Sequence, residues 1–186
     1  MNVLPRMNPP ARLAGIVFAR GAAIDAMIAD ICAELGAAGL GIAGVVQVDR
    51  GDGRPGISNL RLSGIRSGWE IPILQDRGPE ARGCRLDPRA IADVAGLMRE
   101  EIADDPDLVV INRFGRAETE GHGLRAVLEQ VALSGTPLLI GVREDYADAW
   151  AEFHGGLGAQ LPPARDAVIE WCSKACAKEP AALLKA

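Results

Sequence analysis

Four short, largely apolar runs recur along the chain, at residues 13–18, 41–48, 108–111 and 137–140. Glycine, proline or charged residues lie close to both ends of each run. Runs of four to eight residues that are apolar throughout are typical of strands buried on both faces of a parallel sheet. The pattern therefore predicts four central, buried strands.

Between these runs, apolar side chains recur three and four positions apart, the spacing of one face of an α-helix. The segments with this spacing cover residues 24–35, 87–104, 124–134 and 146–153, and a further one begins at residue 165. Asp87 followed by Pro88 is a favoured helix start, because the aspartate accepts from free amides and proline fits the first turn. Strands that alternate with helices predict an α/β domain of three layers, with helices on both faces of a mainly parallel sheet.

The middle of the chain departs from this alternation. Apolar and polar residues alternate over residues 60–64 and 69–73, which predicts a β-hairpin inserted into the domain. Pro72 cannot donate to a sheet, so we expect the second strand at an edge. The glycine- and proline-rich residues 155–163 are expected to form a loop. The expected organisation is a flexible leader at residues 1–11, a single domain at 12–164, and a C-terminal helix or tail at 165–186.

Length and charge narrow the class of protein. The chain has 186 residues with 20 basic and 25 acidic side chains, a formal net charge of −5. This balance argues against a nucleic-acid binder, and no apolar run is long enough for a membrane span, so we expect a cytoplasmic protein. Four irregularly spaced cysteines do not indicate a disulfide framework. With only two histidines, the sequence offers no convincing set of metal ligands.

Lysine is confined to the C-terminal end, at Lys174, Lys178 and Lys185, and the other 17 basic residues are arginines. The motif G-K-[ST], whose lysine contacts nucleotide phosphates in Walker A loops, is therefore absent. This composition excludes the usual route of nucleotide hydrolysis. It leaves arginine as the cation that can bind an oxyanion.

Three segments are expected to meet at the carboxyl edge of the sheet, where ligands bind in parallel α/β folds: residues 19–23, 112–123 and 142–146. A strand that turns into a helix presents free amides and a positive dipole end to an anion. The candidates in that turn are Arg20, Gly21, Ala22, Ala23 and Ile24, and those in the second segment are Asn112, Arg113 and Arg116. The same turn also fits a plain strand–helix connection without a ligand.

Further candidates lie in two predicted loops. Arg82 and Arg85 flank Cys84, where they favour its thiolate and can bind an oxyanion. A solvated loop with an inert cysteine is the alternative. In the other loop, Glu118 is the candidate base if the protein is an enzyme, and His122 is an accessory candidate.

The stretches Gly83-Cys-Arg-Leu-Asp87 and Asn112-Arg-Phe-Gly115, with Glu118, resemble the bacterial domain-of-unknown-function family 2478 over residues 12–160. Members of that family are commonly encoded near molybdate-uptake genes, and some are labelled as ATP-binding proteins of molybdenum transporters. The resemblance implies a role in molybdenum handling or its regulation, with molybdenum-uptake or cofactor-assembly proteins as partners. The missing Walker lysine and transporter signature do not suit the ATP-binding label.

A more distant similarity is to the small P-loop nucleoside-triphosphatases of the thermostable archaeal type. The run Gly64-Ile-Arg-Ser-Gly-Trp69 is similar to part of their hairpin, and Asn112-Arg-Phe-Gly-Arg-Ala-Glu118 to their Walker B stretch. This resemblance implies a P-loop-like topology. Asn112 and Arg113, however, replace the two acidic residues of that stretch, and residues 19–26 depart from Walker A.

Three functions stay open at this point. The first is a catalytically degenerate P-loop-like protein that binds molybdate, a molybdenum-cofactor precursor or a nucleotide. The second is an active nucleoside-triphosphatase, with Glu118 as base and arginines in place of the lysine. The third is an interaction or homodimerisation module that uses Trp69, Ile71 and Ile73 on an exposed edge strand.

Overall fold

The computed structural model describes residues 11–51, 59–75 and 86–177. Its elements follow in the order β1 (Leu13–Phe18), α1 (Ile24–Ala37), β2 (Ile42–Asp49), β3 (Leu60–Gly64), β4 (Glu70–Pro72), α2 (Pro88–Ala103), β5 (Leu108–Phe114), α3 (Arg116–Thr119), α4 (Arg125–Ser134), β6 (Leu138–Arg143), the 3₁₀ turn η1 (Glu144–Tyr146), α5 (Ala147–His154), β7 (Gly158–Leu161) and α6 (Arg165–Ala175). The four apolar runs of the sequence form β1, β2, β5 and β6, as predicted.

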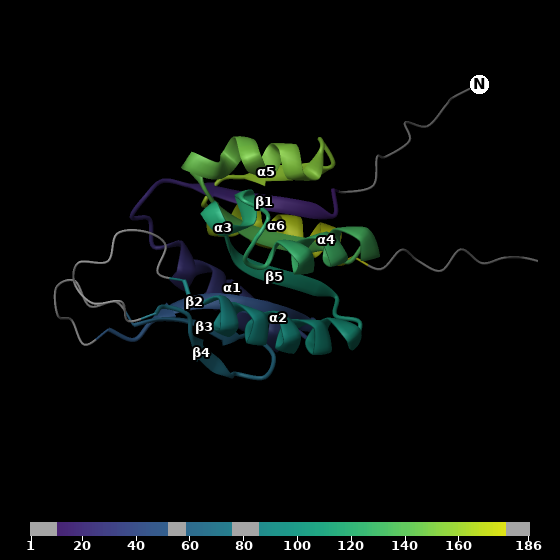
Figure 1. The fold of residues 1–186 in the computed structure, drawn as a ribbon. Helices are drawn as coiled ribbons and strands as arrows, with labels where there is room; N and C mark the ends of the chain where they lie inside the picture. The colour runs from purple at the N-terminus through teal and green to yellow at the C-terminus, as the bar shows by residue number, and fades with distance from the viewer. Residues whose placement is uncertain (1–10, 52–58, 76–85, 178–186) are drawn as a thin grey trace, which may run out of the picture.

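The strands of the described chain form one seven-stranded sheet in the order β4-β3-β2-β5-β6-β1-β7 (Figure 1). Neighbouring strands from β2 to β7 pair in parallel. Strands β3 and β4 add to this sheet as an antiparallel hairpin. Pro72 ends β4 at the outer edge, where a missing N–H leaves no ladder bond unmade. The predicted mainly parallel sheet with an inserted hairpin is confirmed.

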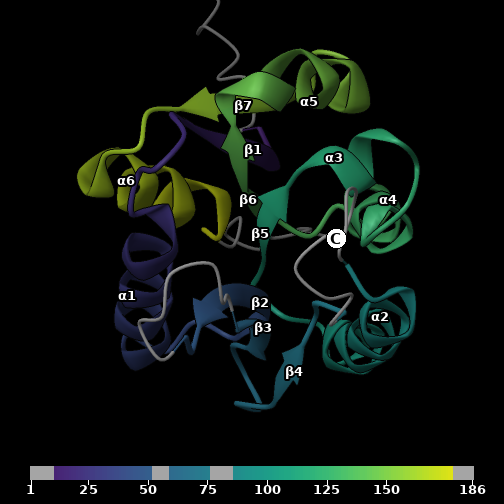
Figure 2. The ribbon, with the colours of Figure 1, turned by 60° about the vertical axis from the view of Figure 1, so that its left-hand side comes forward.

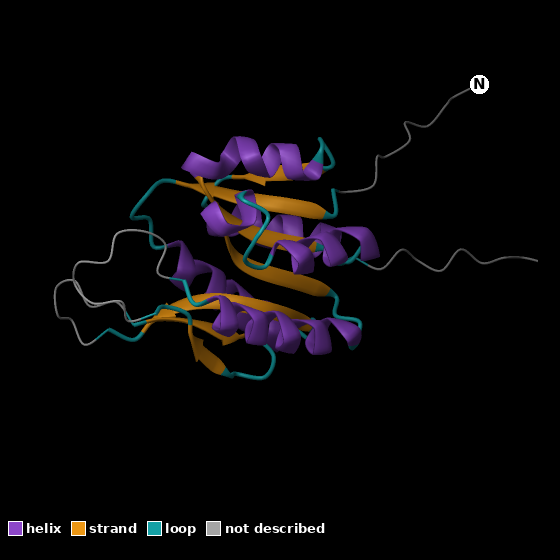
Figure 3. Ribbon diagram, viewed as in Figure 1, coloured by secondary structure: helices purple, strands orange, loops and turns teal. Residues whose placement is uncertain are grey.

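Helices cover both faces of this sheet, which gives three layers (Figures 2 and 3). Helices α1 and α6 lie on one face, and α2, α4 and α5 lie on the other. Each face has its own apolar core: Ile28 and Trp171 belong to one, and Met98, Leu128 and Trp150 to the other. Because both faces are buried, the central strands are apolar throughout.

Two predicted loops are wrong. At residues 112–123, β5 continues through Phe114 and α3 follows it. Phe114 is fully buried against Trp150, with ring centroids 5.6 Å apart, so this packing extends the strand past a polar pair of residues. At residues 155–163, the chain forms β7, which pairs in parallel with β1. Main-chain pairing sustains β7 because its side chains are only half-buried or exposed.

The hairpin does not present an apolar edge to solvent. Trp69 and Ile71 are half-buried and pack against the core beneath α2, and Ile73 is buried. The indole N–H of Trp69 donates to Glu101 of α2 at 3.2 Å, which turns the ring inward. The strand lies at the sheet edge, as predicted, but the expected exposure of Trp69, Ile71 and Ile73 is wrong. Docking or homodimerisation through this edge stays a prediction.

Helix α6 is tied to the residues that precede β1. The Trp171 indole donates to the carbonyl of Ala11 at 3.2 Å, and Arg12 donates to the carbonyl of Ala175 at 2.9 Å. Cys172 is fully buried in the core between α6 and the sheet. None of the helices in the described part of the chain is long and apolar enough to cross a membrane.

Candidate functional site

One acidic side chain joins the first helix to the central strand. Asp25 lies in the first turn of α1, and both of its carboxylate oxygens are 2.8 Å from Nη2 of Arg113. The side-chain amide of Asn112 donates to the same carboxylate at 2.5 Å. A carboxylate at a helix N-terminus is stabilised by the helix dipole. These contacts hold Asn112 and Arg113, from the end of β5, beside the start of α1.

The turn between β1 and α1 bonds to itself. The amide of Ala22 donates to the carbonyl of Ala19 at 3.1 Å, and the amide of Ile24 donates to the carbonyl of Ala22 at 2.9 Å. Arg20 reaches from this turn to Asp145, 3.7 Å away. Of the residues expected to contact an anion here, Arg20, Gly21, Ala22 and Ala23 are exposed and Ile24 is buried. Two of the amides in the turn are thus already used within it.

A cavity of about 190 Å³ opens at the carboxyl ends of β2, β5 and β6, an edge of the sheet that Figure 2 turns toward the viewer. Its polar lining includes Arg113, Arg116 and Arg143, with Asn112 and Tyr146 beside them. The structure therefore brings together four residues that the sequence analysis named separately from the turn: Asn112, Arg113, Arg116 and Glu118. Residues 20–24 do not line this cavity.

Three buried polar atoms of residues that line the cavity have no hydrogen-bond partner: Oδ1 of Asn112, and Nε of Arg113 and of Arg143. Among the described side chains only Arg61 and Trp150 have another such atom. The Nε of Arg143 lies 2.8 Å from the Asp145 carboxylate, an ion pair without hydrogen-bond alignment. Buried groups without partners cost roughly 1–3 kcal/mol each, and their concentration around one cavity makes it the candidate binding site.

Glu118 has a structural role in this geometry. It is only 8% exposed, one carboxylate oxygen accepts from the amide of Gly115 at 3.0 Å, and the other accepts from the amide of Leu124 at 3.1 Å. A Cβ at Gly123 would lie 2.2 Å from the same carboxylate, and its φ of +63° also favours glycine. Glu118 thus links the end of β5 to the start of α4 through hydrogen bonds to main-chain amides.

The accessory candidates do not gather at the cavity. His122 is exposed and lines a second, larger groove between α2 and α3. Arg116 lines both hollows and pairs with Glu120 at 2.7 Å. Arg82, Cys84 and Arg85 lie outside the described residues.

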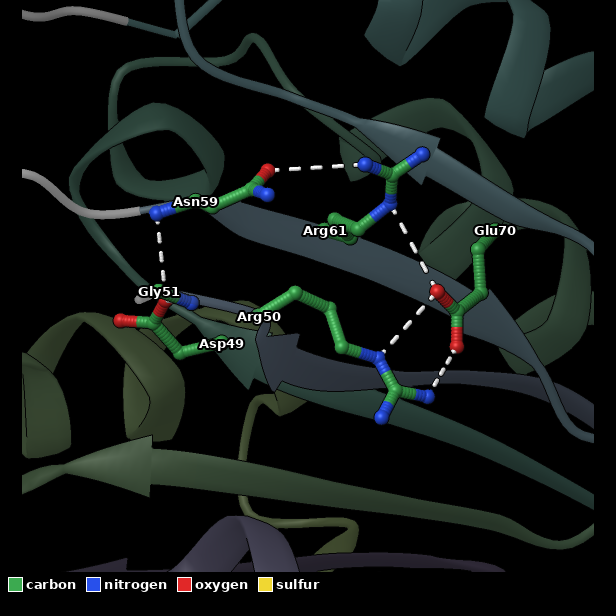
Figure 4. Close-up of polar contacts among 6 residues, drawn as sticks. All are labelled: Asp49, Arg50, Gly51, Asn59, Arg61 and Glu70. Carbon is green, nitrogen blue, oxygen red and sulfur yellow. Dashed lines mark hydrogen bonds and ion pairs between the residues drawn. The ribbon is translucent and has the colours of Figure 1, made fainter. Parts of the chain in front are cut away.

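A second polar cluster holds the base of the hairpin (Figure 4). Glu70 pairs with Arg50 at 2.6 Å and with Arg61 at 3.6 Å, and the hydrogen bond from Arg50 lowers the pKa of Glu70. One oxygen of Asp49 accepts from the amides of Gly51 and Asn59, at 2.9 and 3.1 Å. These contacts join the end of β2 to the start of β3 and to β4.

Of the described cysteines, Cys32 and Cys172 are buried and Cys176 is half-buried. Burial raises the pKa of Cys32 and of Cys172 to about 12, and that of Cys176 to about 11. All three therefore stay protonated and unreactive at neutral pH. The described residues contain no group of three or more His, Cys, Asp or Glu side chains that could hold a metal ion.

The family model described as "Protein of unknown function (DUF2478)" matches residues 13–171. The chain belongs to the DUF2478 family. This assignment agrees with the resemblance carried by the stretches around Cys84 and Asn112, and it places the whole sheet and most of α6 within the DUF2478 region.

A much longer protein shares a region with this chain. The chain is 35% identical over 162 residues to the molybdenum import ATP-binding protein ModC 2 of Bradyrhizobium diazoefficiens. The match covers 87% of this chain but only 18% of that relative. Most of the relative therefore lies outside the shared region.

A solved structure shares the fold. The solution structure of a human cancer-related nucleoside triphosphatase superposes with a TM-score of 0.61 at 17% identity, covering 87% of this chain and 94% of the other. The DUF2478 chain thus has the three-layer α/β fold of a P-loop-like nucleoside triphosphatase, as the sequence resemblance implied.

Two polar residues of this edge were missing from the predicted site. Arg143 lies three positions after the buried strand predicted at residues 137–140 and within the third expected segment, so its position at the carboxyl edge was available as a signal. Asp25 stands out in sequence only as an acidic residue at a helix start. Its partner Arg113 is 88 positions away, and only the fold brings the two together.

Proposed function

We propose that this DUF2478 protein binds a small oxyanion in the cavity at the ends of β5 and β6 and does not hydrolyse nucleotides. The observation that carries the proposal is the pair of arginines that line one cavity, Arg113 and Arg143, whose buried Nε atoms make no aligned hydrogen bond. The nearest charge to the Arg143 Nε is the Asp145 carboxylate at 2.8 Å. The two arginine side chains are 27% and 25% exposed. An anion beside them would supply charged acceptors where the protein supplies none in hydrogen-bond geometry.

The chemistry of the lining favours an oxyanion over a neutral ligand. A guanidinium group presents several N–H donors in a plane, and it binds tetrahedral oxyanions through paired, charge-assisted hydrogen bonds. The cavity of about 190 Å³ has room for such an ion, since a water molecule takes up about 30 Å³. The Tyr146 hydroxyl, 3.2 Å from Arg143, adds a neutral donor to the set.

The contacts of the acidic residues support binding without hydrolysis. Magnesium-dependent phosphoryl transfer needs carboxylates free to hold the ion and a base free to activate water. Asp25 is neutralised by Arg113, and both oxygens of Glu118 are held by main-chain amides. The role of Glu118 as a base stays a prediction that this geometry does not favour.

Molybdate is the first candidate ligand. It is a tetrahedral oxyanion, and a relative that shares a region with this chain is named as a molybdenum import protein. A role in molybdenum handling or its regulation is therefore part of the proposal, with a molybdenum-cofactor precursor or a nucleotide as the other candidates.

The test is isothermal titration of the full chain with molybdate, tungstate, sulfate, phosphate and ATP, followed by Arg143→Gln. We expect binding of at least one of these anions, weakened about tenfold or more by the substitution, because a charge-assisted contact contributes roughly 1.5–3 kcal/mol. Arg125→Gln is the matched control, since Arg125 is 28% exposed, pairs with Glu129 and does not itself line the cavity. No heat with any anion, or equal losses in both variants, would contradict the proposal.

A further inference from the structure

The oxyanion cavity continues into a much larger groove. This α2–α3 groove has a volume of about 710 Å³, and it shares Leu86, Ile91, Arg116 and Ala117 with the cavity. Because the same four residues line both hollows, the two form adjoining parts of one surface. A ligand held in the cavity by its anionic end would extend into the groove.

The two parts differ in chemistry. The groove is lined mainly by apolar or small residues of α2 and of the segment from α3 to α4, among them Pro88, Ala92 and Ala95. Its cationic groups are Arg99 and Arg116, of which Arg116 stands at the junction with the cavity. Its volume falls within the ~300–1,000 Å³ typical of small-molecule sites, which combine apolar walls with a few polar groups.

We propose that the ligand is an organic oxyanion, whose anionic group binds at Arg113 and Arg143 and whose apolar ring lies in the α2–α3 groove. This inference rests on the proposed function and, among its candidates, favours the organic ones, a molybdenum-cofactor precursor or a nucleotide, over molybdate alone. An inorganic oxyanion alone would fill the cavity and leave the apolar walls of the groove in water. A ring attached to the anion would cover Ile91 and Ala92, and burial of that apolar area adds affinity.

The test compares two phosphates on the full chain by titration calorimetry. We expect 1-naphthyl phosphate to bind about tenfold or more tightly than inorganic phosphate, because only the former places a ring in the groove. Ala92→Trp fills the groove from an exposed position on α2. It should bring the affinity for naphthyl phosphate down to that for phosphate and leave phosphate binding unchanged.

Ala126→Trp is the matched control, because Ala126 is also exposed on a helix but lies outside the groove. It should change neither affinity, whereas Arg143→Gln should weaken both phosphates. Circular dichroism checks that the tryptophan variants are folded, and Ala92→Gln replaces Ala92→Trp if that variant is not.

Three results would overturn the inference while leaving the proposed function standing. These are equal affinities for both phosphates in the parent protein, a preference that survives Ala92→Trp, and naphthyl phosphate binding that Arg143→Gln leaves unchanged. Absence of binding by any anion would instead overturn the proposed function, and this inference with it.

Discussion

The contacts of Glu101 on α2 (the Glu101 cluster) and those of Asn112 and Arg113 at the carboxyl edge of the sheet differ in how fully their polar groups are hydrogen-bonded. Beneath the hairpin, buried Glu101 accepts from the Trp69 indole at 3.2 Å and from the amide of Gly44 at 3.4 Å. At the carboxyl edge, Asn112 and Arg113 share the Asp25 carboxylate, yet each retains a buried polar atom without a partner. The first cluster uses its carboxylate fully within the fold, and the second does not.

The difference separates a structural role from a binding role. Gly44 has a φ of +129°, and a Cβ there would lie 1.9 Å from the carbonyl oxygen of Val110, so Glu101 stabilises a backbone that is tightly constrained. A buried carboxylate whose donors are all protein groups stabilises one conformation. Unpartnered polar atoms beside a cavity carry an energetic cost that a bound ligand would offset.

The largest effect is expected from Glu101→Leu. The substitution leaves the Trp69 indole and the Gly44 amide without an acceptor, so the free energy of unfolding should fall by about 2–3 kcal/mol. Urea denaturation measures this loss. Glu100→Leu, at the exposed neighbouring position, should change stability by less than about 0.5 kcal/mol. Equal losses of stability in the two variants would contradict the structural role of Glu101. Anion affinity should be unchanged in both variants.

Arg113→Gln should affect anion binding much more than stability. It removes a partly exposed ion pair, which costs less than about 1 kcal/mol of stability, but it should weaken anion binding at least about tenfold. Arg61→Gln is an informative control, because Arg61 is 28% exposed and its Nε is also unpartnered, but it does not line the cavity. If Arg61→Gln weakened binding as much, unpartnered atoms would not locate the site.

The sequence predicted the frame of the molecule better than its site. Apolar runs bounded by turns identified β1, β2, β5 and β6, because strands buried on both faces need apolar residues at every position. The strand β7 was not predicted, because it forms by pairing with β1 and its sequence has no pattern of buried apolar residues. Such pairing is a property of the assembled sheet rather than of the segment.

The candidate site was likewise predicted only in part. Asn112 and Arg113 were named because they follow a buried strand, and parallel strands carry ligand sites at that end. The turn at residues 20–24 was named for its free amides, yet it bonds partly to itself and lies outside the cavity lining. The ion pair of Asp25 with Arg113 depends on contacts between distant segments, which no local pattern encodes.

Glu118→Gln tests whether a bonded carboxylate next to the cavity is structural like Glu101. A glutamine keeps one acceptor oxygen and turns a donor toward the other amide, so stability should fall by about 1–2 kcal/mol in urea denaturation. Anion affinity should not fall, because the substitution removes a negative charge from the cavity lining. Phosphate release from ATP with Mg²⁺ should be undetectable in both proteins. Measurable hydrolysis that the substitution abolishes would assign Glu118 as a base. It would also reject the proposal that the protein does not hydrolyse nucleotides.

Asp25→Asn should have the smallest effect, and it should strengthen anion binding rather than weaken it. The Asp25 carboxylate occupies the Arg113 guanidinium from within the protein, at 2.8 Å. Asparagine preserves shape and an acceptor oxygen but removes the competing charge, so an added anion should bind about two- to five-fold more tightly. Titration of the parent and variant proteins at two salt concentrations measures the gain, which should shrink as salt screens the charges.

Asp30→Asn is the matched control for that gain, because it makes the same charge change at an exposed position farther along α1. An equal gain in both variants would reduce the effect to net charge. Weaker binding in Asp25→Asn would mean that Asp25 orients Arg113 for the ligand rather than competing with it. Asp25 would then hold its donors in place, as Glu101 does. The two sites would differ only in the unpartnered atoms of Asn112 and Arg113, which remain available to an anion.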